Sequence, residues 1–447
     1  MSVFNFLNEK IFLYVFDNYL GTSIRKDLDF LLKSQYWTRD KLILYQNRLL
    51  KELINHCYCH VPYYKNLFHS LGITPWDITS IRDLKYLPIL TKDVLRENIL
   101  NGSMIADNIS KKQIISNSSS GSTGQPLQYY HHIRSESMKK SCAIRAWYWM
   151  GFKLGDKLLR VSPIERKGRL KKLQDIANRS HYVYLQSLSD ENISFLIKKI
   201  SAIKPKILRI YPDQLFILTK YMIGNGIYID NIEAINTTGS NLTVELRSSA
   251  KDLFGCQIYD SYSCEGGASV MEVPNHKCYY SAMEYAVTEV LDVNDNHSNI
   301  GRLITTDLWN YATPFIRYDT QDIIELDENN NEGLELLRIK RIYGRESEIL
   351  VTSDGKKYFV NNFTGIFQDI HGLKQFQIVQ KEAEKFRVLI KVGDCESQIV
   401  VNKVKDALRF LFSDRNEVEI KVVDDIPLEK SGKRRFIIRD KSVSFSL

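Results

Sequence analysis

Small hydroxylated residues and glycines gather in one short stretch, Ser119-Ser-Gly-Ser-Thr-Gly-Gln-Pro126. Glycines let backbone N–H groups curl around phosphate oxygens, and serine and threonine hydroxyls donate further hydrogen bonds to them. The stretch is not a Walker loop, because the spacing differs and no lysine follows the last glycine. A flexible surface loop is the alternative reading. The residues expected to hold phosphate are Ser119, Ser120, Gly121, Ser122, Thr123 and Gly124.

Further motifs follow this loop in a fixed order. They are Thr238-Gly-Ser240, Tyr262…Glu265, Tyr318-Asp-Thr-Gln-Asp322, Gly344-Arg345 and Pro427…Ser431-Gly-Lys433. Together the six motifs resemble the adenylate-forming superfamily of acyl-CoA synthetases, luciferases and peptide-synthetase adenylation domains. The phrases His60-Val-Pro-Tyr-Tyr64, Leu87-Pro-Ile-Leu-Thr-Lys92 and Gly151-Phe-Lys-Leu-Gly-Asp156 are similar to its phenylacetate-CoA ligase branch and capsule-polysaccharide relatives. The resemblance covers nearly the whole chain.

The resemblance implies a role for each matched position in binding ATP. Residues 119–124 would cradle the β- and γ-phosphates, and Glu265 would help to hold Mg²⁺, a hard cation that prefers oxygen ligands. Asp322 would accept hydrogen bonds from both ribose hydroxyls, and Arg345 would contact ribose or phosphate. Gly239 and Ser240 belong to the segment expected against adenine, and Tyr262 is expected to stack on the base.

Lys433 is the main catalytic residue that the resemblance implies, together with Glu265. Its ammonium would bridge a substrate carboxylate and the α-phosphate, and so bring two repelling anions into attack range. Simple solvation is the alternative for a lysine in a basic tail. Two positions depart from the family pattern: the segment Tyr262-Ser-Cys-Glu265 lacks the usual glycine and is one residue short, and Gln321 stands where glycine is common.

A second group of residues has the chemistry of a zinc site. Cys264, His276 and Cys278 would supply most of a tetrahedral ligand set, with Cys256 and Glu272 nearby in the sequence. Some members of the resembled branch carry Cys/His-rich insertions at this place. The spacing is not that of a standard finger, and a buried cysteine usually packs as a small apolar residue. Structural zinc and simple packing therefore both stay open.

Composition bounds the class of protein. The chain has 447 residues and a net charge of +8, with cations concentrated at 166–172 and 430–441. Such clusters attract phosphate groups, although no zinc-finger or RNA-binding signature indicates nucleic acid. Seven cysteines, an odd number, favour a reducing cytosol over a disulfide framework. No signal peptide is recognised, and no apolar run of ~18 residues predicts a membrane span.

Periodicity predicts the elements that must position these residues. Apolar spacing indicates helices over 41–57, 134–150, 190–200, 212–223 and 242–254, and Thr91 caps another. Buried strands at 158–161 and 207–211 alternate with these helices, which indicates an α/β architecture. After residue 345, strands at 375–380, 386–392 and 417–423 surround a helix at 396–412. We expect a large domain of mixed sheets and helices over 1–345, with a helical lead-in over 1–110, and a small mobile α+β lid over 346–447.

The function implied by the resemblance is an ATP-dependent ligase. It would activate a carboxylic acid as acyl-AMP with release of pyrophosphate, and would then pass the acyl group to a CoA thiol, an amine or an amino sugar. The cations at 166–172 could meet CoA phosphates. A degenerate member that only binds nucleotide, or scaffolds a polysaccharide complex, is the alternative. Dimers are common in this branch, so a homodimer is left open, and the sequence does not reveal the acid.

Overall fold

The computed structural model describes residues 3–118, 128–162, 165–166, 168–185, 189–240, 242–264, 266–328, 333–345, 348–354, 356–367, 370–393, 395–412, 415–427, 435–440 and 443. Contacts group the chain into two compact units. Unit 1 comprises Met1–Asp156 and Ser261–Ile342, and unit 2 comprises Lys157–Asp260 and Tyr343–Leu447. The expected domain boundary at residue 345 stays a prediction.

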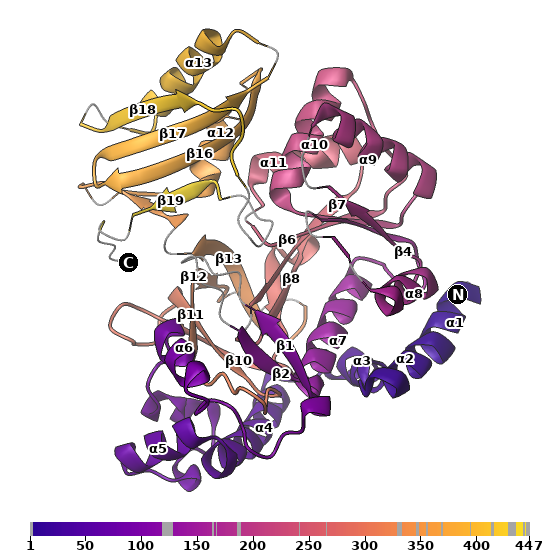
Figure 1. The fold of residues 1–447 in the computed structure, drawn as a ribbon, viewed down its shortest axis with the longest axis vertical. Helices are drawn as coiled ribbons and strands as arrows, with labels where there is room; N and C mark the ends of the chain where they lie inside the picture. The colour runs from indigo at the N-terminus through magenta and orange to yellow at the C-terminus, as the bar shows by residue number, and fades with distance from the viewer. Residues whose placement is uncertain are drawn as a thin grey trace. The chain divides into compact units, whose positions relative to one another are not determined.

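Helices form most of the first part of unit 1 (Figure 1). The 22-residue helix α4 begins at Arg39. It is capped by Thr38, whose side chain accepts a hydrogen bond from the N–H of Lys41, and it ends before Pro62. Gln46 on α4 donates to the carbonyls of Met283 and Ala286, which ties the helix to the strands of unit 1. The helices are α1 (Val3–Leu7), the π-helix η1 (Asn8–Phe12), α2 (Leu13–Leu20), α3 (Ile24–Ser34), α4 (Arg39–His60), α5 (Pro62–Leu71), η2 (Pro75–Asp77), η3 (Ile81–Tyr86), α6 (Lys92–Leu100), η4 (Lys111–Gln113) and α7 (Ile133–Trp149).

The strands that lie wholly or partly in unit 1 follow the order β10-β11-β12-β13-β9-β8-β7. The pairs β10–β11, β11–β12, β13–β9, β9–β8 and β8–β7 are antiparallel. Their bounds are β7 (Gln257–Cys264), β8 (Ala268–Val273), β9 (Cys278–Ser281), β10 (Ala286–Leu291), β11 (Ile300–Asp307), β12 (Tyr318–Leu326) and β13 (Leu337–Arg345), and the short 3-10 helix η5 (Pro274–His276) joins β8 to β9. A separate hairpin pairs β1 (Ile114–Ser118) with β2 (Gln128–His132).

Unit 2 begins with alternating strands and helices. Strands β4, β3, β5 and β6 are parallel neighbours in that order, as strands joined through helices must be. The elements are β3 (Leu158–Ser162), α8 (Arg169–Ala177), β4 (Ser180–Tyr184), α9 (Asp190–Ile203), β5 (Ile207–Ile210), α10 (Pro212–Asn225), β6 (Ala234–Thr238) and α11 (Val244–Phe254). Apolar side chains of these strands and of α9, α10 and α11 form one core.

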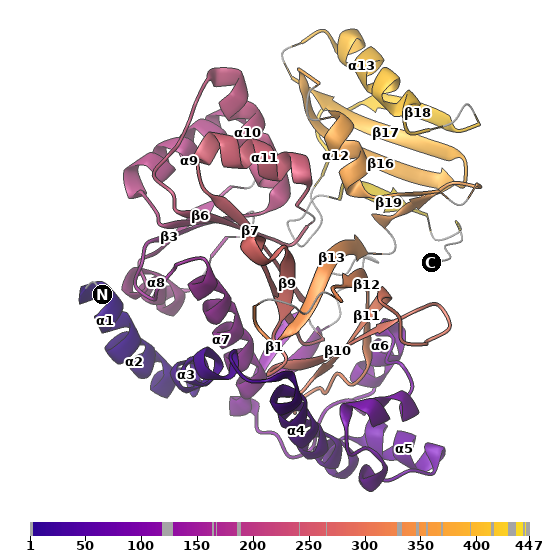
Figure 2. The ribbon, with the colours of Figure 1, turned by 180° about the vertical axis from the view of Figure 1, so that it is seen from behind.

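The remaining part of unit 2 has a core of its own. A four-stranded sheet of order β18-β17-β16-β19 packs with α12 and α13 around Phe363, Phe376 and Val404 (Figure 2). The elements are β14 (Leu350–Val351), β15 (Lys357–Tyr358), α12 (Val360–Phe367), β16 (Leu373–Glu382), β17 (Lys385–Val392), α13 (Ser397–Arg409), β18 (Glu417–Val422) and β19 (Ile437–Arg439). The expected α/β class, with mixed sheets and a small α+β part at the end, is confirmed.

Candidate functional site

The expected phosphate-binding loop connects two paired strands. Residues 119–124 lie outside the described residues, but both ends of their connection are fixed, because Ser118 on β1 pairs with Gln128 on β2. Further along the hairpin Asn117 pairs with Tyr129, so its register is regular. Strands β1 and β2 thus form a regular antiparallel pair in unit 1, and the expected phosphate-binding stretch lies between them in the sequence.

Histidines that the sequence reading missed lie on the same hairpin. His131 on β2 is fully buried, and its Nδ1 is 3.2 Å from Nδ2 of Asn117. Its Nε2 has no hydrogen-bond partner among the described residues. Burial lowers the pKa of the adjacent His132 to about 4, and repulsion from Arg134 adds to the effect. The sequence feature that could have revealed these histidines is their position as a pair directly after the expected phosphate-binding loop.

In unit 1 the structure brings Tyr262 and Asp322 together. Tyr262 at the end of β7 donates its hydroxyl hydrogen bond to Oδ2 of Asp322 on β12. Burial, and then the Asp322 carboxylate, raises the pKa of Tyr262 well above its ordinary value. The phenol therefore stays protonated and acts as a hydrogen-bond donor that orients the carboxylate. The prediction that Tyr262 stacks on a base stays untested.

A β-bulge presents Asp322. The register between β11 and β12 is irregular here. Arg302 on β11 pairs with Ile323 on β12, but Ile304, only two residues further along β11, pairs with Asp319, four residues away on β12. Gln321, inside this irregularity, has a φ of 63°, and its N–H donates to Oδ1 of Asp319 at 2.8 Å. Bulges of this kind redirect side chains next to active sites. Gln321 stands where glycine is common in the resembled family, and its backbone conformation is one that favours glycine.

Two glycines follow Glu265, which itself lies outside the described residues. A Cβ on Gly266 would lie 2.5 Å from Oγ1 of Thr305, and one on Gly267 would lie 2.7 Å from Cβ of Asp307. Both distances are shorter than any normal contact between such atoms. The chain directly after Glu265 therefore packs so closely against β11 that side chains are excluded there.

In unit 2 a second group of predicted residues gathers where parallel strands end. Because Ile210 at the end of β5 pairs with Thr237 near the end of β6, Tyr211 and Gly239 emerge at one edge of the sheet. Ligands in open α/β sheets bind at this edge. Thr237 donates to Oδ1 of Asp260 at 2.6 Å, and both residues are buried.

Polar atoms without partners mark the same edge of unit 2. Within the described part of the chain, Oγ of Ser240 and Oε1 of Gln214 are buried and lack a hydrogen-bond partner. Gln214 lies in the first turn of α10, directly after β5, and is 3% exposed. A buried polar atom is normally satisfied, so these two atoms suit a polar ligand at this edge. Gly239, between β6 and Ser240, has a φ of 90°, which requires glycine.

The other nucleotide and catalytic residues remain predictions. Arg345 is the last residue of β13 and is half-buried. Lys433 lies outside the described residues, as do the neighbouring positions 428–434. The expected junction at 345–350 runs from the end of β13 to the start of β14.

The expected zinc ligands are not brought together. Cys264 pairs with Ala268 at the start of β8, whereas Cys278 pairs with Val273 at its end. Five residues of strand separate these positions by roughly 16 Å, which is much too far for shared coordination. Nδ1 of His276 instead lies 2.9 Å from the Tyr280 hydroxyl. Among the described residues no three His, Cys, Asp or Glu side chains gather to hold a metal ion.

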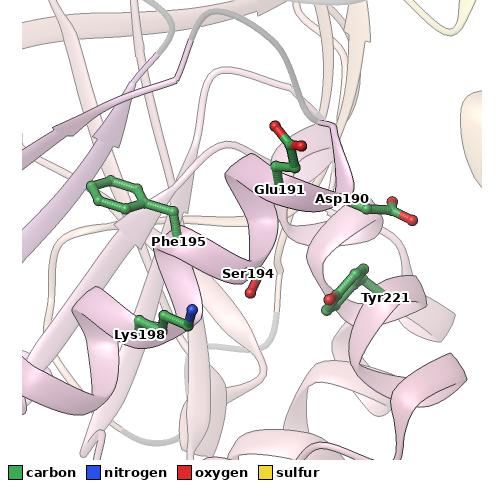
Figure 3. A pocket seen from close by; sticks show the side chains of 6 residues that line it. All are labelled: Asp190, Glu191, Ser194, Phe195, Lys198 and Tyr221. Carbon is green, nitrogen blue, oxygen red and sulfur yellow. The ribbon is translucent and has the colours of Figure 1, made fainter.

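One surface pocket is lined by none of the predicted site residues. Figure 3 shows its lining from two helices of unit 2: Asp190, Glu191, Ser194, Phe195 and Lys198 on α9, and Tyr221 on α10. Its acids, amine and aromatic rings form an open surface, more apolar than polar, rather than an enclosed cavity. Nothing in the sequence distinguished these residues from an ordinary amphipathic helix.

Comparison with known proteins finds similarity to CapK and to phenylacetate-coenzyme A ligases. A family model described as the CapK C-terminal domain matches residues 350–440. Protein CapK of Staphylococcus aureus is 25% identical over 411 residues, which cover 88% of this chain and 88% of that protein. Phenylacetate-coenzyme A ligase of Pseudomonas putida is 25% identical over 329 residues, covering 70% of this chain and 72% of the enzyme.

A solved structure has the same fold. The crystal structure of 2-hydroxyisobutyryl-CoA ligase in the postadenylation state, in complex with 2-HIB-AMP, has a TM-score of 0.69 at 15% sequence identity. The match covers 92% of this chain and 93% of that one. At this level of identity the likeness establishes the architecture only. In the part of the chain that the structure describes, no helix has the length and apolar character needed to cross a membrane.

Proposed function

Because the chain belongs to the adenylate-forming superfamily, in a branch with CapK and the phenylacetate-coenzyme A ligases, we propose that it is an ATP-dependent ligase that activates a carboxylic acid as acyl-AMP. The carboxylate oxygen of the acid attacks the α-phosphate of ATP, the bond to the β-phosphate breaks, and pyrophosphate leaves. The acyl group is then transferred to an acceptor, and AMP is released.

The observation that carries this proposal is the Tyr262–Asp322 pair on a β-bulge in unit 1. A carboxylate accepts hydrogen bonds from two hydroxyls at once, which suits the ribose of ATP. Tyr262, kept protonated, orients that carboxylate before the nucleotide arrives. Fixing the sugar in this way would position the α-phosphate for attack, and positioning is the main source of catalysis in phosphoryl chemistry.

The rest of the machinery is assigned by the resemblance. Residues 119–124, held between β1 and β2, cradle the leaving phosphates, and Glu265 contributes to Mg²⁺ binding, where the metal would screen the phosphate charge. Lys433 bridges the two reacting anions from a small C-terminal lid. The match of the CapK C-terminal domain model from residue 350 onward supports a hinge near residues 345–350.

For the acceptor, we propose the thiol of CoA as the first choice, because two of the similar proteins are coenzyme A ligases. An amine or amino sugar in surface polysaccharide assembly is the second choice. The acid pocket is proposed at the strand edge of unit 2, where Thr237 and Asp260 are joined by a hydrogen bond and Ser240 and Gln214 carry unpartnered atoms.

The test is pyrophosphate release from the purified protein with ATP across a panel of aryl, short-chain, hydroxy and amino acids. Asp322→Asn should raise the KM for ATP by at least about tenfold, because it replaces a charge-assisted acceptor worth roughly 1.5–3 kcal/mol. Glu325→Gln is the matched control, since Glu325 lies on the same strand and pairs with Lys340 at 2.6 Å. An unchanged KM in Asp322→Asn would contradict the ribose role.

Lys433→Ala should nearly abolish acyl-adenylate formation, whereas Lys430→Ala in the same basic segment should keep it. Products with CoA, amino acids and amino sugars, identified by mass spectrometry, would then name the acceptor. ATP binding without pyrophosphate release for any acid would refute the ligase and favour a nucleotide-binding scaffold.

A further inference from the structure

The first helical segment of unit 1, formed by α1, η1 and α2 over residues 3–20, leaves many large apolar side chains exposed. Its buried residues are polar: Asn5, Asn8 and Asp17. Asn5 Nδ2 donates to the carbonyl of Leu154 and to Oδ1 of Asp156, both at 2.9 Å. The polar side chains that are fully buried thus hold the segment to its own unit by hydrogen bonds, and most of its half-buried residues are apolar: Leu7, Phe12, Leu13, Phe16 and Leu20. Figure 2 shows α1 and α2 following one another toward α3.

Two contacts fix this orientation. The Asp17 carboxylate caps α3, because its oxygens accept from the N–H groups of Ile24 at 3.0 Å and Arg25 at 2.8 Å. At the other end, a Cβ on Gly155 would lie 2.5 Å from the carbonyl oxygen of Phe4. The backbone of α1 thus approaches so closely that only glycine fits, and the segment cannot rotate its apolar side inward.

Large apolar side chains are exposed at intervals along the whole segment, from Val3 to Tyr19. These side chains are 44% (Ile11) to 74% (Tyr19) exposed. They are Val3, Phe4, Phe6, Ile11, Tyr14, Val15 and Tyr19. The four aromatic side chains alone leave roughly 350–550 Å² in water, if a buried aromatic covers about 150–250 Å². That area equals the largest apolar patch on a typical monomer, about 300–600 Å², and such patches mark interaction surfaces.

The charges beside this face are cationic. Glu9 is drawn inward, where it accepts a hydrogen bond from the Tyr148 hydroxyl at 3.1 Å, and Asp17 is buried as the cap of α3. Lys10 is exposed, and the Arg25 guanidinium lies over the Tyr14 ring at 5.9 Å. An apolar face with cations and without exposed acids complements an anionic surface. A second copy would instead bring the same cations face to face across a two-fold axis.

Helix α8 in unit 2 has the same chemistry and is an independent observation. None of its nine residues is buried, and Leu173 and Ile176 are exposed. Arg169, Lys171 and Lys172 are exposed on the same short helix. Helices that combine exposed aliphatic side chains with cations lie in the headgroup region of anionic bilayers.

We propose that the protein docks on the surface of a bilayer that contains anionic lipid. The aromatic and aliphatic side chains of residues 3–20 enter the headgroup–acyl boundary, and Lys10 and Arg25 meet the lipid phosphates. Helix α8 carries cations of the same kind, and their attraction to anionic lipid is limited in range by the Debye length. This docking is peripheral and does not depend on the ligase activity.

The test is flotation of the full-length protein with vesicles of phosphatidylcholine alone or with about 30 mol% phosphatidylglycerol, an anionic fraction that attracts cationic segments strongly. We expect binding to the anionic vesicles that weakens with salt. Phe6→Ser/Tyr19→Ser should lower the partition coefficient by roughly a hundredfold, about tenfold for each aromatic side chain removed from the boundary. Lys10→Glu should lower it less and should reduce the salt dependence.

The matched control is Trp76→Ser, which removes an even more exposed aromatic ring from η2, outside residues 3–20. It should float like the wild type, and all variants should keep the wild-type Tm, because the altered side chains point into solvent. No flotation of the wild type with either vesicle would overturn the proposal. So would a mass twice that of the chain by light scattering that Phe6→Ser/Tyr19→Ser halves, since a second copy would then cover the face.

Discussion

Replacing Gly267 with alanine should damage both stability and the expected Mg²⁺-binding segment, because this glycine is confined in two ways. Its φ is +104°, a conformation that other residues adopt only at a cost of roughly 1–3 kcal/mol. The added Cβ would also lie 2.7 Å from Cβ and 2.8 Å from Cα of Asp307. Overpacking of this kind typically costs about 1–3 kcal/mol more.

Asp307 cannot move away to relieve that contact. Its carboxylate is fully buried and accepts hydrogen bonds from the hydroxyls of Ser135 at 2.7 Å and Tyr285 at 3.1 Å. It also accepts from the N–H groups of Trp309 at 2.8 Å and Asn310 at 3.1 Å. Four donors hold it in place, so most of the strain should be retained rather than relaxed.

The expected loss for Gly267→Ala is therefore about 2–6 kcal/mol, and at 2–4 °C per kcal/mol the Tm should fall by roughly 5–20 °C. Gly72→Ala is the matched control: Gly72 has a φ of +66° and nothing within 4 Å of an added Cβ. It should lose only about 1 kcal/mol from backbone strain. The measurements are the Tm of both variants in thermal unfolding and the rate of pyrophosphate release by the protein that remains folded. Equal losses in the two variants would refute it.

Three further predictions concern other parts of the molecule. Gln321→Gly should raise the free energy of unfolding by up to about 1 kcal/mol in urea titration, because the φ of 63° no longer strains a side chain; a large loss would contradict this. Glu284→Gln should lower the free energy of unfolding by roughly 3–5 kcal/mol, because the substitution breaks a buried 2.8 Å ion pair with Arg145. The double substitution Arg145→Leu/Glu284→Leu should recover much of that loss. Burial holds the folded pKa of His132 at about 4, below the ordinary 6.5, so its contribution to stability is complete above pH 6.5 and is lost as pH falls toward 4. His132→Asn should flatten the pH dependence of Tm in that range, and an unaltered profile would contradict the assignment.

Local patterns in the sequence predicted most of the elements. Apolar spacing over 41–57 corresponds to α4 (Arg39–His60), and the cap at Thr91 is confirmed by its acceptance of a hydrogen bond from the N–H of Val94 at 3.4 Å. The helix predicted over 396–412 corresponds to α13 (Ser397–Arg409). These features depend on neighbours within a few residues, which a single sequence contains.

What the sequence could not supply depends on distant contacts. The pairing of Tyr262 with Asp322 joins residues 60 positions apart, and the bulge that presents Asp322 arises from the register between β11 and β12. The same limit explains the zinc expectation: Cys264 and Cys278 are close in sequence, but the β8 strand lies between their pairing positions. The exposure of large apolar side chains over residues 3–20 could not be predicted either, because amphipathic spacing reveals two faces and does not say which one is buried.

The discontinuity of unit 1 has a consequence for synthesis. Residues 157–260 interrupt this unit in the sequence. During synthesis the first part of the unit therefore stays incomplete until Ser261–Ile342 has emerged from the ribosome and the strands from β8 to β13 can pair. At about 5–20 residues per second that wait lasts many seconds, during which the helices over 1–156 expose the surfaces that will meet those strands. The core around Phe363, Phe376 and Val404 comes from one uninterrupted stretch and can close as soon as it is made. Nascent chains halted before residue 342 should therefore be held by chaperones and cut readily by protease.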